Sequence, residues 1–300
     1  MNKVVVIGAG NVGKAYSLSL INQNTNIDEL IFVDIDNKKA LGNAMDLSHT
    51  NMFINSKMTI KAGSYMDCKG AKIVVIAAGA NQRSNESRLE LGSRNINVIK
   101  TITKKVVSSG FKGIFLVATN PVDIMTYMVR KYSEFDSNKV IGVGTLIDTA
   151  RCKYLLSEKL GVNTKDIDLY VLGEHGDSMF VPWSNAKVGT LDITDLVLKN
   201  DLKQIEKNVK KIGYRIIDLK GETSFAIALC LTKITNAIIN DESIVLPISA
   251  PYNGIYIGMP SVINKTGIKG VMKLKLTNEE LNKLEDSIEI LKKNISSLEG

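Results

Sequence analysis

A glycine-rich turn between an apolar run and a helical pattern constrains the fold of this chain more than any other feature. Residues 4–7 are typical of a buried strand, and Gly8-Ala9-Gly10-Asn11-Val12-Gly13 follows them directly. In this setting the glycines permit a tight turn and the close approach of backbone to a pyrophosphate, while the start of the helix offers N–H groups to the phosphates. The sequence therefore predicts a strand, turn and helix that bind a dinucleotide.

An aspartate ends the next predicted strand. The apolar residues 30–33 are followed by Asp34, about 20 residues beyond the last glycine, where a carboxylate accepts hydrogen bonds from the adenosine ribose. Taken alone, Asp34 is equally an ordinary aspartate at a strand end. The combined order of strand, glycine turn, helix, strand and acid favours dinucleotide binding.

Strands and helices continue to alternate through the first half of the chain. Apolar runs predict strands at 58–62, 72–76, 113–118 and 140–142, with helices at 38–47 and 89–108. This order predicts an α/β fold built on a doubly wound parallel sheet of the Rossmann type. We place a domain boundary at 143/144, so that residues 1–143 form the dinucleotide-binding domain and residues 144–300 form a second domain.

The second domain is predicted to be α+β. Shorter strands are expected at 243–247 and 258–262, together with three long helices. The last helix starts with the capping box Thr277-Asn278-Glu279-Glu280. One of its faces, expected to be core or subunit contact, carries Leu281, Leu284, Ile288, Leu291 and Ile295.

One of only two histidines lies in Leu172-Gly173-Glu174-His175-Gly176-Asp177, between two glycines and two carboxylates. The apolar residues 168–172 predict a strand, so His175 is expected where that strand ends in a turn. Because an imidazole titrates near neutral pH, His175 is a candidate for proton transfer. The alternative is a loop histidine that only hydrogen-bonds to a backbone carbonyl.

Further polar residues are expected at the carboxyl edge of the sheet. Asn120-Pro121 follows the predicted strand 113–118, and its peptide bond could be cis. The polar segment 81–88 follows the strand 72–76 and is interpreted as a lid. Asp148 and Arg151, three apart on a predicted helix, project from one face, which is also compatible with a simple intrahelical ion pair.

Composition argues against several classes of protein. The 38 basic and 31 acidic residues give a net charge of +7, but the lysines are spread along helices, which favours small anionic ligands over nucleic acid. Cys68, Cys152 and Cys230 are odd in number and far apart, which predicts reduced thiols without disulfides or a metal site. No leader and no apolar run of ~20 residues is evident, so we expect a cytoplasmic protein that does not bind membranes.

These motifs, taken together and in order, resemble those of the L-lactate and malate dehydrogenase family over essentially the whole chain. The resemblance implies a Rossmann domain with a substrate domain, NAD(H) as the cofactor, and a homotetramer or homodimer. The segments that carry it are Gly8 to Gly13, Val33-Asp34-Ile35-Asp36, Asn81-Gln82 through Arg88-Leu89, Ala118-Thr119-Asn120-Pro121-Val122-Asp123, Ile147-Asp148-Thr149-Ala150-Arg151 and Gly173-Glu174-His175-Gly176-Asp177.

The resemblance also implies a role for each matching residue. His175 would exchange a proton with the substrate oxygen, and Asp148 would hold its imidazole in one tautomer. Arg151 would bind the substrate carboxylate, and Arg88 in the lid would polarise the carbonyl. Asn120 would lie near the carbonyl and the nicotinamide, and Thr223 in the substrate pocket. The implied cofactor contacts are Gly8, Gly10, Asn11, Val12, Gly13, Asp34, Ala78, Gly79 and Asn120.

Gln82 separates the possible substrates. The malate enzymes carry an arginine at this lid position, six residues before Arg88, whereas the lactate enzymes carry glutamine. The prediction is therefore an NAD-dependent L-lactate dehydrogenase that reduces pyruvate. The alternatives are a malate dehydrogenase, with Arg83 in the arginine's place after a one-residue shift of the lid, and a dehydrogenase for bulkier L-2-hydroxy acids.

Two further expectations concern function and regulation. A protein that senses NAD without catalysis would need the glycine turn but not His175, Asp148 or Arg151. Many bacterial lactate dehydrogenases are activated by fructose 1,6-bisphosphate through an arginine and a histidine, and Lys153 and Asp168 occupy those positions here. Because an acid repels a bisphosphate, no such activation is expected.

Overall fold

The computed structural model describes residues 1–54, 57–80 and 88–299. In this part of the chain, nine strands form one sheet in the order β12-β11-β10-β6-β5-β4-β1-β2-β3. The run β3-β2-β1-β4-β5-β6 is parallel and has the doubly wound order of dinucleotide-binding sheets. These six strands are β1 (Lys3–Ile7), β2 (Glu29–Val33), β3 (Thr59–Ala62), β4 (Ile73–Ile76), β5 (Ile114–Val117) and β6 (Val140–Gly142). The predicted Rossmann-type α/β fold is confirmed.

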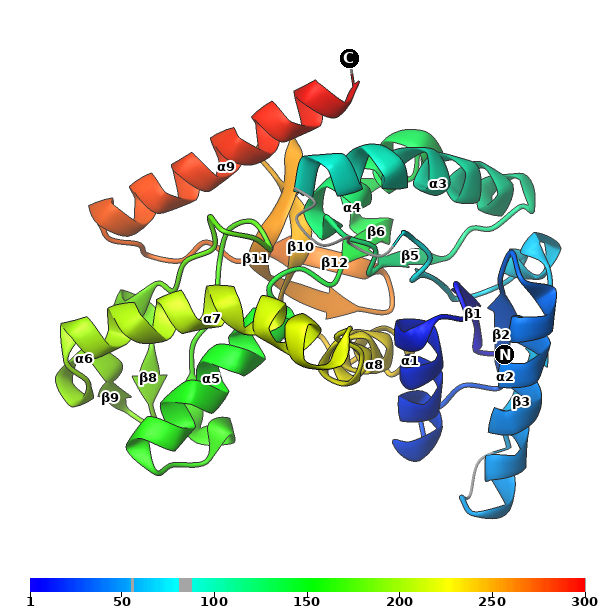
Figure 1. The fold of residues 1–300 in the computed structure, drawn as a ribbon, viewed down its shortest axis with the longest axis horizontal. Helices are drawn as coiled ribbons and strands as arrows, with labels where there is room; N and C mark the ends of the chain where they lie inside the picture. The colour runs from blue at the N-terminus through cyan, green and yellow to red at the C-terminus, as the bar shows by residue number, and fades with distance from the viewer. Residues whose placement is uncertain (55–56, 81–87, 300) are drawn as a thin grey trace.

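Both faces of the parallel sheet are covered by helices. Successive side chains of a strand point to opposite faces, so a strand of consecutive apolar residues needs a core on each side. Val4 and Val6 of β1 pack in one core with α1 (Asn11–Asn22), α2 (Asn37–His49) and α8 (Phe225–Ile239). Val5 and Ile7 pack in a second core with α3 (Arg88–Ser108), α4 (Val122–Ser133) and α9 (Asn278–Glu299). Figure 1 shows α3, α4 and α9 together on one side of the sheet.

The second half of the chain extends the same sheet. It contributes β10 (Ile244–Tyr252), β11 (Ile255–Asn264) and β12 (Gly267–Val271), which are antiparallel to one another, and Ser249 of β10 pairs with Gly142 of β6. The two segments predicted as short strands are thus parts of strands of 9 and 10 residues. Since the sheet runs across residue 143, the domain division at that point stays a prediction.

A smaller layer completes the fold. A three-stranded sheet contains β7 (Ile167–Asp168), β8 (Lys187–Val188) and β9 (Leu191–Asp192). Around it lie α5 (Leu146–Leu160), α6 (Ile193–Leu196) and α7 (Lys199–Lys220), which crosses the front of the molecule in Figure 1. Short 3-10 turns cover Thr50–Met52, Tyr65–Cys68, Ser137–Lys139, Thr164–Asp166 and Trp183–Asn185.

The strand predicted at residues 168–172 is wrong in extent. β7 ends at Asp168, and the chain pairs again only through isolated bridges of Leu172 with Phe180 and Gly173 with Gly258. Leu169 and Val171 are buried in the core beneath α7, and Leu172 is buried in the core beneath α9. The apolar run therefore reflects burial and not strand pairing, and His175 follows an irregular segment.

The structure also places the last helix and the cysteines. Thr277 and Glu280 form the capping box of α9, and of its predicted apolar face Leu284, Ile288, Leu291 and Ile295 are buried, whereas Leu281 is 42% exposed. The three cysteines are buried free thiols. Among the described helices, none is both long and apolar enough to cross a membrane.

Candidate active site

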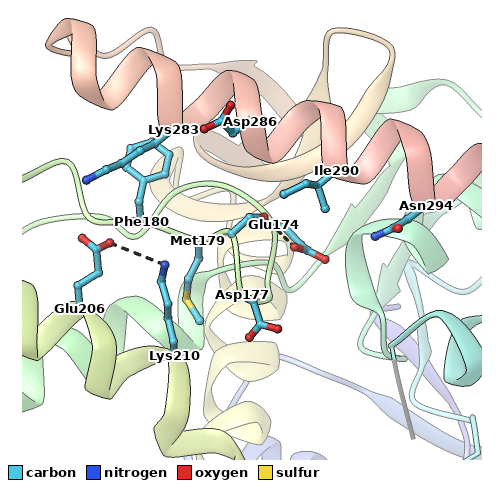
Figure 2. A pocket seen from close by; sticks show the side chains of 11 residues that line it. Glu174, Asp177, Met179, Phe180, Glu206, Lys210, Lys283, Asp286, Ile290 and Asn294 are labelled. Atoms are coloured by element: carbon cyan, nitrogen blue, oxygen red, sulfur yellow. Dashed lines mark hydrogen bonds and ion pairs between the residues drawn. The ribbon is translucent and has the colours of Figure 1, made fainter.

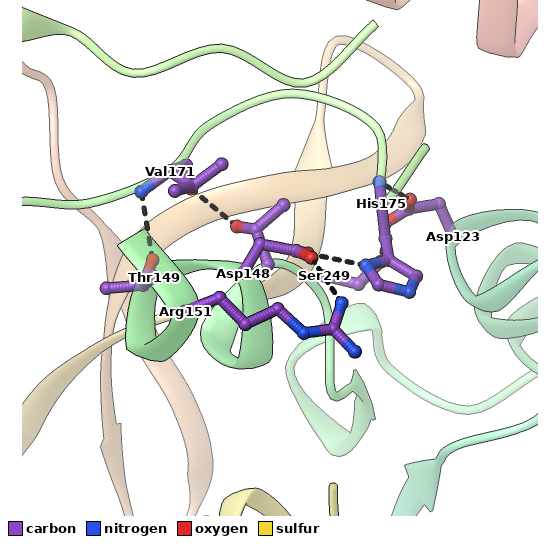
Figure 3. A network of polar contacts seen from close by, with 8 residues as sticks. Asp123, Asp148, Thr149, Arg151, Val171, His175 and Ser249 are labelled. Carbon is purple, nitrogen blue, oxygen red and sulfur yellow. Dashed lines mark hydrogen bonds and ion pairs between the residues drawn. The ribbon is translucent and has the colours of Figure 1, made fainter. Parts of the chain in front are cut away.

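Asp148 and Arg151 on α5 meet His175 from the loop after β7. Oδ2 of Asp148 lies 2.5 Å from Nδ1 of His175, and Oδ1 of the same carboxylate lies 3.1 Å from a guanidinium nitrogen of Arg151. Figure 3 shows the imidazole and the guanidinium approaching the carboxylate side by side. The intrahelical ion pair therefore exists, but it does not exclude the functional role, because the histidine uses the other carboxylate oxygen.

The charge of Asp148 fixes the tautomer of the histidine. Asp148 is fully buried, and burial raises the pKa of its carboxyl group, but the facing His175 and Arg151 outweigh burial and hold that pKa below its ordinary value. An ionised carboxylate can only accept, so the hydrogen of this contact lies on Nδ1 of His175. If His175 exchanges a proton with a substrate, as the sequence predicts, that proton is the one on Nε2.

Arg151 is held between α5 and α7. Its side chain is 13% exposed, and a Cβ atom built at Gly213 of α7 would lie 3.2 Å from one terminal nitrogen. Glycine inside a helix lowers stability by about 1 kcal/mol relative to alanine. At Gly213 this cost leaves room for the guanidinium of Arg151. A guanidinium fixed in this way suits two-pronged binding of a carboxylate.

Backbone contacts fix the loop that carries His175. Gly173 exchanges two hydrogen bonds with Gly258 of β11, at 3.1 and 2.9 Å. The N–H of Glu174 donates to Ser287 Oγ of α9 at 2.8 Å, and the N–H of His175 donates to Asp123 Oδ2 of α4 at 2.7 Å. Sequence reasoning missed these two acceptors. Asp123 had a signal, since it is an acid in the first turn of a helix whose neighbouring residues are apolar.

A cleft of about 470 Å³ opens beside this loop, between α7 and α9 (Figure 2). Four acids, Glu174, Asp177, Glu206 and Asp286, and two lysines, Lys210 and Lys283, are among the described residues that line it. A substrate carboxylate would meet a net negative lining there. This lining does not suit an anionic 2-oxo acid, and the sequence predicts its binding at Arg151 and His175 instead.

The glycine turn after β1 fits a pyrophosphate. Gly8 has φ +105°, and a Cβ atom there would lie 2.6 Å from the backbone nitrogen of Ala78. Gly10 differs, because no described heavy atom lies within 4 Å of its Cβ position. No described side chain caps the start of α1, where the first N–H groups have no partner within the helix. The turn is thus packed against β4 on one side and open on the other.

Asp34 lies beside this turn at the end of β2. One of its carboxylate oxygens accepts the N–H of Ala9 at 2.6 Å, and the other accepts the N–H of Asp36 at 2.9 Å. These bonds fix the orientation of a half-exposed carboxylate and leave it acceptor capacity for hydroxyl groups.

Neighbouring strand ends bring together the remaining predicted cofactor contacts. Asn120 is exposed just beyond β5, its bond to Pro121 is cis, and its carbonyl accepts from Asn95 at 2.8 Å. Asn95 also accepts the N–H of Ala80, which follows Ala78 and Gly79 at the end of β4. Thr223 lies between α7 and α8. Gln82 and the side chain of Arg88 lie outside the described residues.

Comparison with known proteins identifies the fold. Residues 2–142 match the model of the lactate/malate dehydrogenase NAD binding domain, and residues 145–299 match the alpha/beta C-terminal domain of the same family. The chain belongs to the lactate/malate dehydrogenase family. The resemblance inferred from the motifs is confirmed, and so is NAD as the cofactor of the first half.

Curated lactate/malate dehydrogenase family members are similar over their full length. The L-lactate dehydrogenase of Borrelia turicatae is 45% identical, covering 99% of this chain and 98% of its own, and that of a Geobacillus species is 44% identical, covering 99% and 96%. A solved lactate dehydrogenase from a Medee basin deep-sea metagenome library superposes with a TM-score of 0.96, at 45% identity over 100% of this chain and 99% of its own. The minor L-lactate dehydrogenase of Enterococcus mundtii superposes at 0.93, with 36% identity over 99% and 98%.

Two further expectations can be placed within this family fold. No group of three or more described His, Cys, Asp or Glu side chains is arranged to hold a metal ion.

Lys153 is half-buried; burial lowers the pKa of its ammonium group, and the negative charge of Asp168 acts in the opposite direction. The absence of activation by fructose 1,6-bisphosphate stays a prediction.

Proposed function

We propose that the protein is an NAD-dependent L-lactate dehydrogenase that interconverts pyruvate and L-lactate. The observation that carries this proposal is the arrangement of Asp148 between His175 and Arg151, in a chain that is similar over its full length to L-lactate dehydrogenases. Proton transfer and carboxylate binding are thereby paired in one place, as reduction of a 2-oxo acid requires.

Pyruvate reduction needs a hydride at the carbonyl carbon and a proton at its oxygen. NADH supplies the hydride when it is bound. Protonated His175 donates the proton from Nε2, while its Nδ1–H stays hydrogen-bonded to Asp148. In lactate oxidation, Nε2 of neutral His175 accepts a proton from the hydroxyl group of lactate. Ionised Asp148 stabilises the cationic imidazole in both directions, as the carboxylate of a Ser-His-Asp triad does.

Arg151 and the lid residues bind the substrate in this proposal. The guanidinium of Arg151 pairs with the carboxylate of pyruvate, which fixes the carbonyl toward His175. Arg88 polarises the carbonyl, while Gln82 faces the methyl group. Asn120 and Thr223 line the remaining space near the carbonyl and the nicotinamide.

The cofactor contacts follow from the glycine turn. The open side of Gly10 and the N–H groups at the start of α1, at Asn11, Val12 and Gly13, suit the pyrophosphate. Asp34 suits the adenosine ribose, and Ala78, Gly79 and Asn120 at the ends of β4 and β5 suit the nicotinamide half.

Substrate choice tests this function. We expect wild-type protein to oxidise NADH faster with pyruvate than with oxaloacetate, and Gln82→Arg to move the ratio of the two kcat/KM values toward oxaloacetate by ~10³-fold or more. The arginine would pair with the second carboxylate of oxaloacetate and would be an unpaired charge against the methyl group of pyruvate. If wild-type protein prefers oxaloacetate and Arg83→Ala loses that preference, the protein is a malate dehydrogenase.

We also propose that the protein acts in the cytoplasm as a homotetramer or homodimer. Apolar side chains are exposed at helical spacing on two helices that flank α1. They are Leu41 and Met45 on α2, 53% and 55% exposed, and Phe225 and Leu229 on α8, 72% and 53% exposed. Burial of such residues stabilises subunit contacts. Light scattering on the purified protein tests the oligomeric state.

A further inference from the structure

A buried carboxylate lies directly beneath the loop of the proposed acid–base histidine. Asp123, in the first turn of α4, is 2% exposed. Its Oδ2 atom accepts the N–H of His175 at 2.7 Å, and its Oδ1 atom accepts the hydroxyl of Ser249 at 2.6 Å. Figure 3 shows this carboxylate on the opposite side of the His175 backbone from Asp148. One side chain thus joins α4, the catalytic loop and β10.

The chemistry of this contact is unusual for a purely structural residue. Burying a carboxylate costs free energy, and here the hydrogen bonds come from a backbone N–H and a hydroxyl instead of a cation. Burial raises the pKa of Asp123 to about 6, although both hydrogen bonds and the charge of His175 act to lower it. A neutral asparagine would accept the same N–H at a lower cost, so Asp123→Asn distinguishes a need for the charge from a need for an acceptor alone.

Asp123 and Asp148 hold His175 at two different points. The ring of His175 is held at Nδ1 by Asp148 of α5, and its backbone is held by Asp123 of α4. Two anchors on different helices define both where the ring lies and how it is turned. Gly258 and Ser287 hold the two residues before His175, whereas Asp123 holds the backbone of His175 itself, and without it this residue could shift along the carboxylate of Asp148. A displacement of about 1 Å of a catalytic group can cost about 10²-fold in rate.

The same residue connects the histidine with the cofactor half of the site. Asp123 follows Asn120 after the cis bond to Pro121, at the junction of β5 and α4. The side chain of Asn120 lies at the strand end where the nicotinamide half of the cofactor is expected. A shift of His175 relative to this junction would change the distance between the proton donor and the carbon that receives hydride.

We propose that Asp123 is a positioning residue for His175, whose carboxylate holds the backbone of the catalytic loop so that proton and hydride transfer occur at one substrate position. This inference rests on the proposed function, since it concerns the same proton transfer. It acts through His175 and involves no contact between Asp123 and the substrate.

Four variants of the full-length protein test the proposal. Asp123→Ala and Asp123→Leu remove the acceptor of the His175 N–H, and leucine also refills most of the volume, so that one variant remains informative if the other does not fold. Asp123→Asn retains an acceptor without the charge. Ser249→Ala is the matched control, because it removes the other hydrogen bond of the same carboxylate and leaves His175 bonded.

We expect kcat for pyruvate to fall by about 10²-fold in Asp123→Ala and Asp123→Leu, with KM for pyruvate and Kd for NADH within about threefold of wild type. Because the chemical step becomes slower, the isotope effect on kcat from deuterated NADH should increase. Asp123→Asn and Ser249→Ala should keep kcat within about tenfold of wild type.

Two results would overturn the proposal. The first is a folded Asp123→Leu or Asp123→Ala variant that binds NADH and retains kcat within about threefold of wild type. The second is a loss of activity that appears equally in Ser249→Ala or that tracks weaker NADH binding, which would indicate a general structural role. If wild-type protein itself does not reduce pyruvate, the proposed function fails instead, and the two failures are thereby distinct.

Discussion

Oδ2 of Asp148 lies 2.5 Å from Nδ1 of His175, although 27 positions of the chain separate the two residues. The helix α5 brings the carboxylate to this point, and the bridge between Gly173 and Gly258 brings the histidine. The contact assigns a hydrogen to Nδ1, and in the proposed function Nε2 is the nitrogen that exchanges a proton with the substrate. Its loss is therefore expected to affect chemistry more than substrate binding.

Asp148→Asn should lower kcat for pyruvate reduction by about 10²- to 10⁴-fold. The amide can donate a hydrogen bond to Nδ1, which favours the wrong tautomer, and it no longer stabilises the imidazolium. Steady-state kinetics with NADH and pyruvate measure the effect, and quenching of NADH fluorescence controls for cofactor binding. Turnover close to wild type would mean that another group holds the imidazole.

Gly213→Ala should raise KM for pyruvate several-fold, although alanine is the better helix former by about 1 kcal/mol. The new methyl group would lie 3.2 Å from the guanidinium of Arg151 and would push it away from its position. Gly42→Ala in α2 is the control, because it adds a methyl group to a helix where no described side chain lies within 4 Å. Gly221→Ala does not serve, because Gly221 has φ +85° and alanine would strain the backbone there. An unchanged KM in Gly213→Ala would show that Arg151 adjusts without loss.

Asp34 should make the protein selective for NADH over NADPH. Its carboxylate is held beside the glycine turn by the N–H of Ala9, so the 2′-phosphate of NADPH would meet a like charge. We expect kcat/KM for NADH to exceed that for NADPH by at least ~10²-fold, and Asp34→Ser to narrow this ratio. Equal values for the two cofactors in wild-type protein would contradict the assignment.

Asp123 should make stability decrease with pH in a defined window. Its pKa is about 6 in the folded chain, against about 3.9 for an unfolded aspartate, so between these values the folded state binds more protons at this group. The contribution of Asp123 to the free energy of unfolding therefore falls as pH rises from about 4 to about 6. The total effect is on the order of 2 to 3 kcal/mol.

Thermal unfolding of wild type and Asp123→Asn at pH 4.5, 5.5 and 7.5 checks this sign. The difference in Tm between variant and wild type should shift in favour of the variant as pH rises, because asparagine does not titrate. Parallel Tm curves over this range would show that Asp123 ionises as in the unfolded chain. Equal protein concentrations are needed, because subunit association also stabilises.

The class of fold and the residue types of the site could be predicted from local patterns in the chain. The glycine turn and Asp34 depend on local geometry, in which a turn, a helix start and a strand end are encoded within about 30 consecutive residues. The pairing of Asp148 with Arg151 is likewise local, since both lie on one helix face. Such features can be predicted because the residues that form them are neighbours in the chain.

The groups that hold the histidine are distant in the chain and could not be read from local patterns. Asp123 of α4 and Ser287 of α9 contact the loop of His175, and Ser249 of β10 holds Asp123, so these contacts depend on how the three elements pack. The apolar residues 168–172 illustrate the same limit, because burial and strand pairing leave similar patterns in a sequence. Hydrophobic patterning specifies what is buried, whereas the partner of each buried polar group is set by the assembled layers.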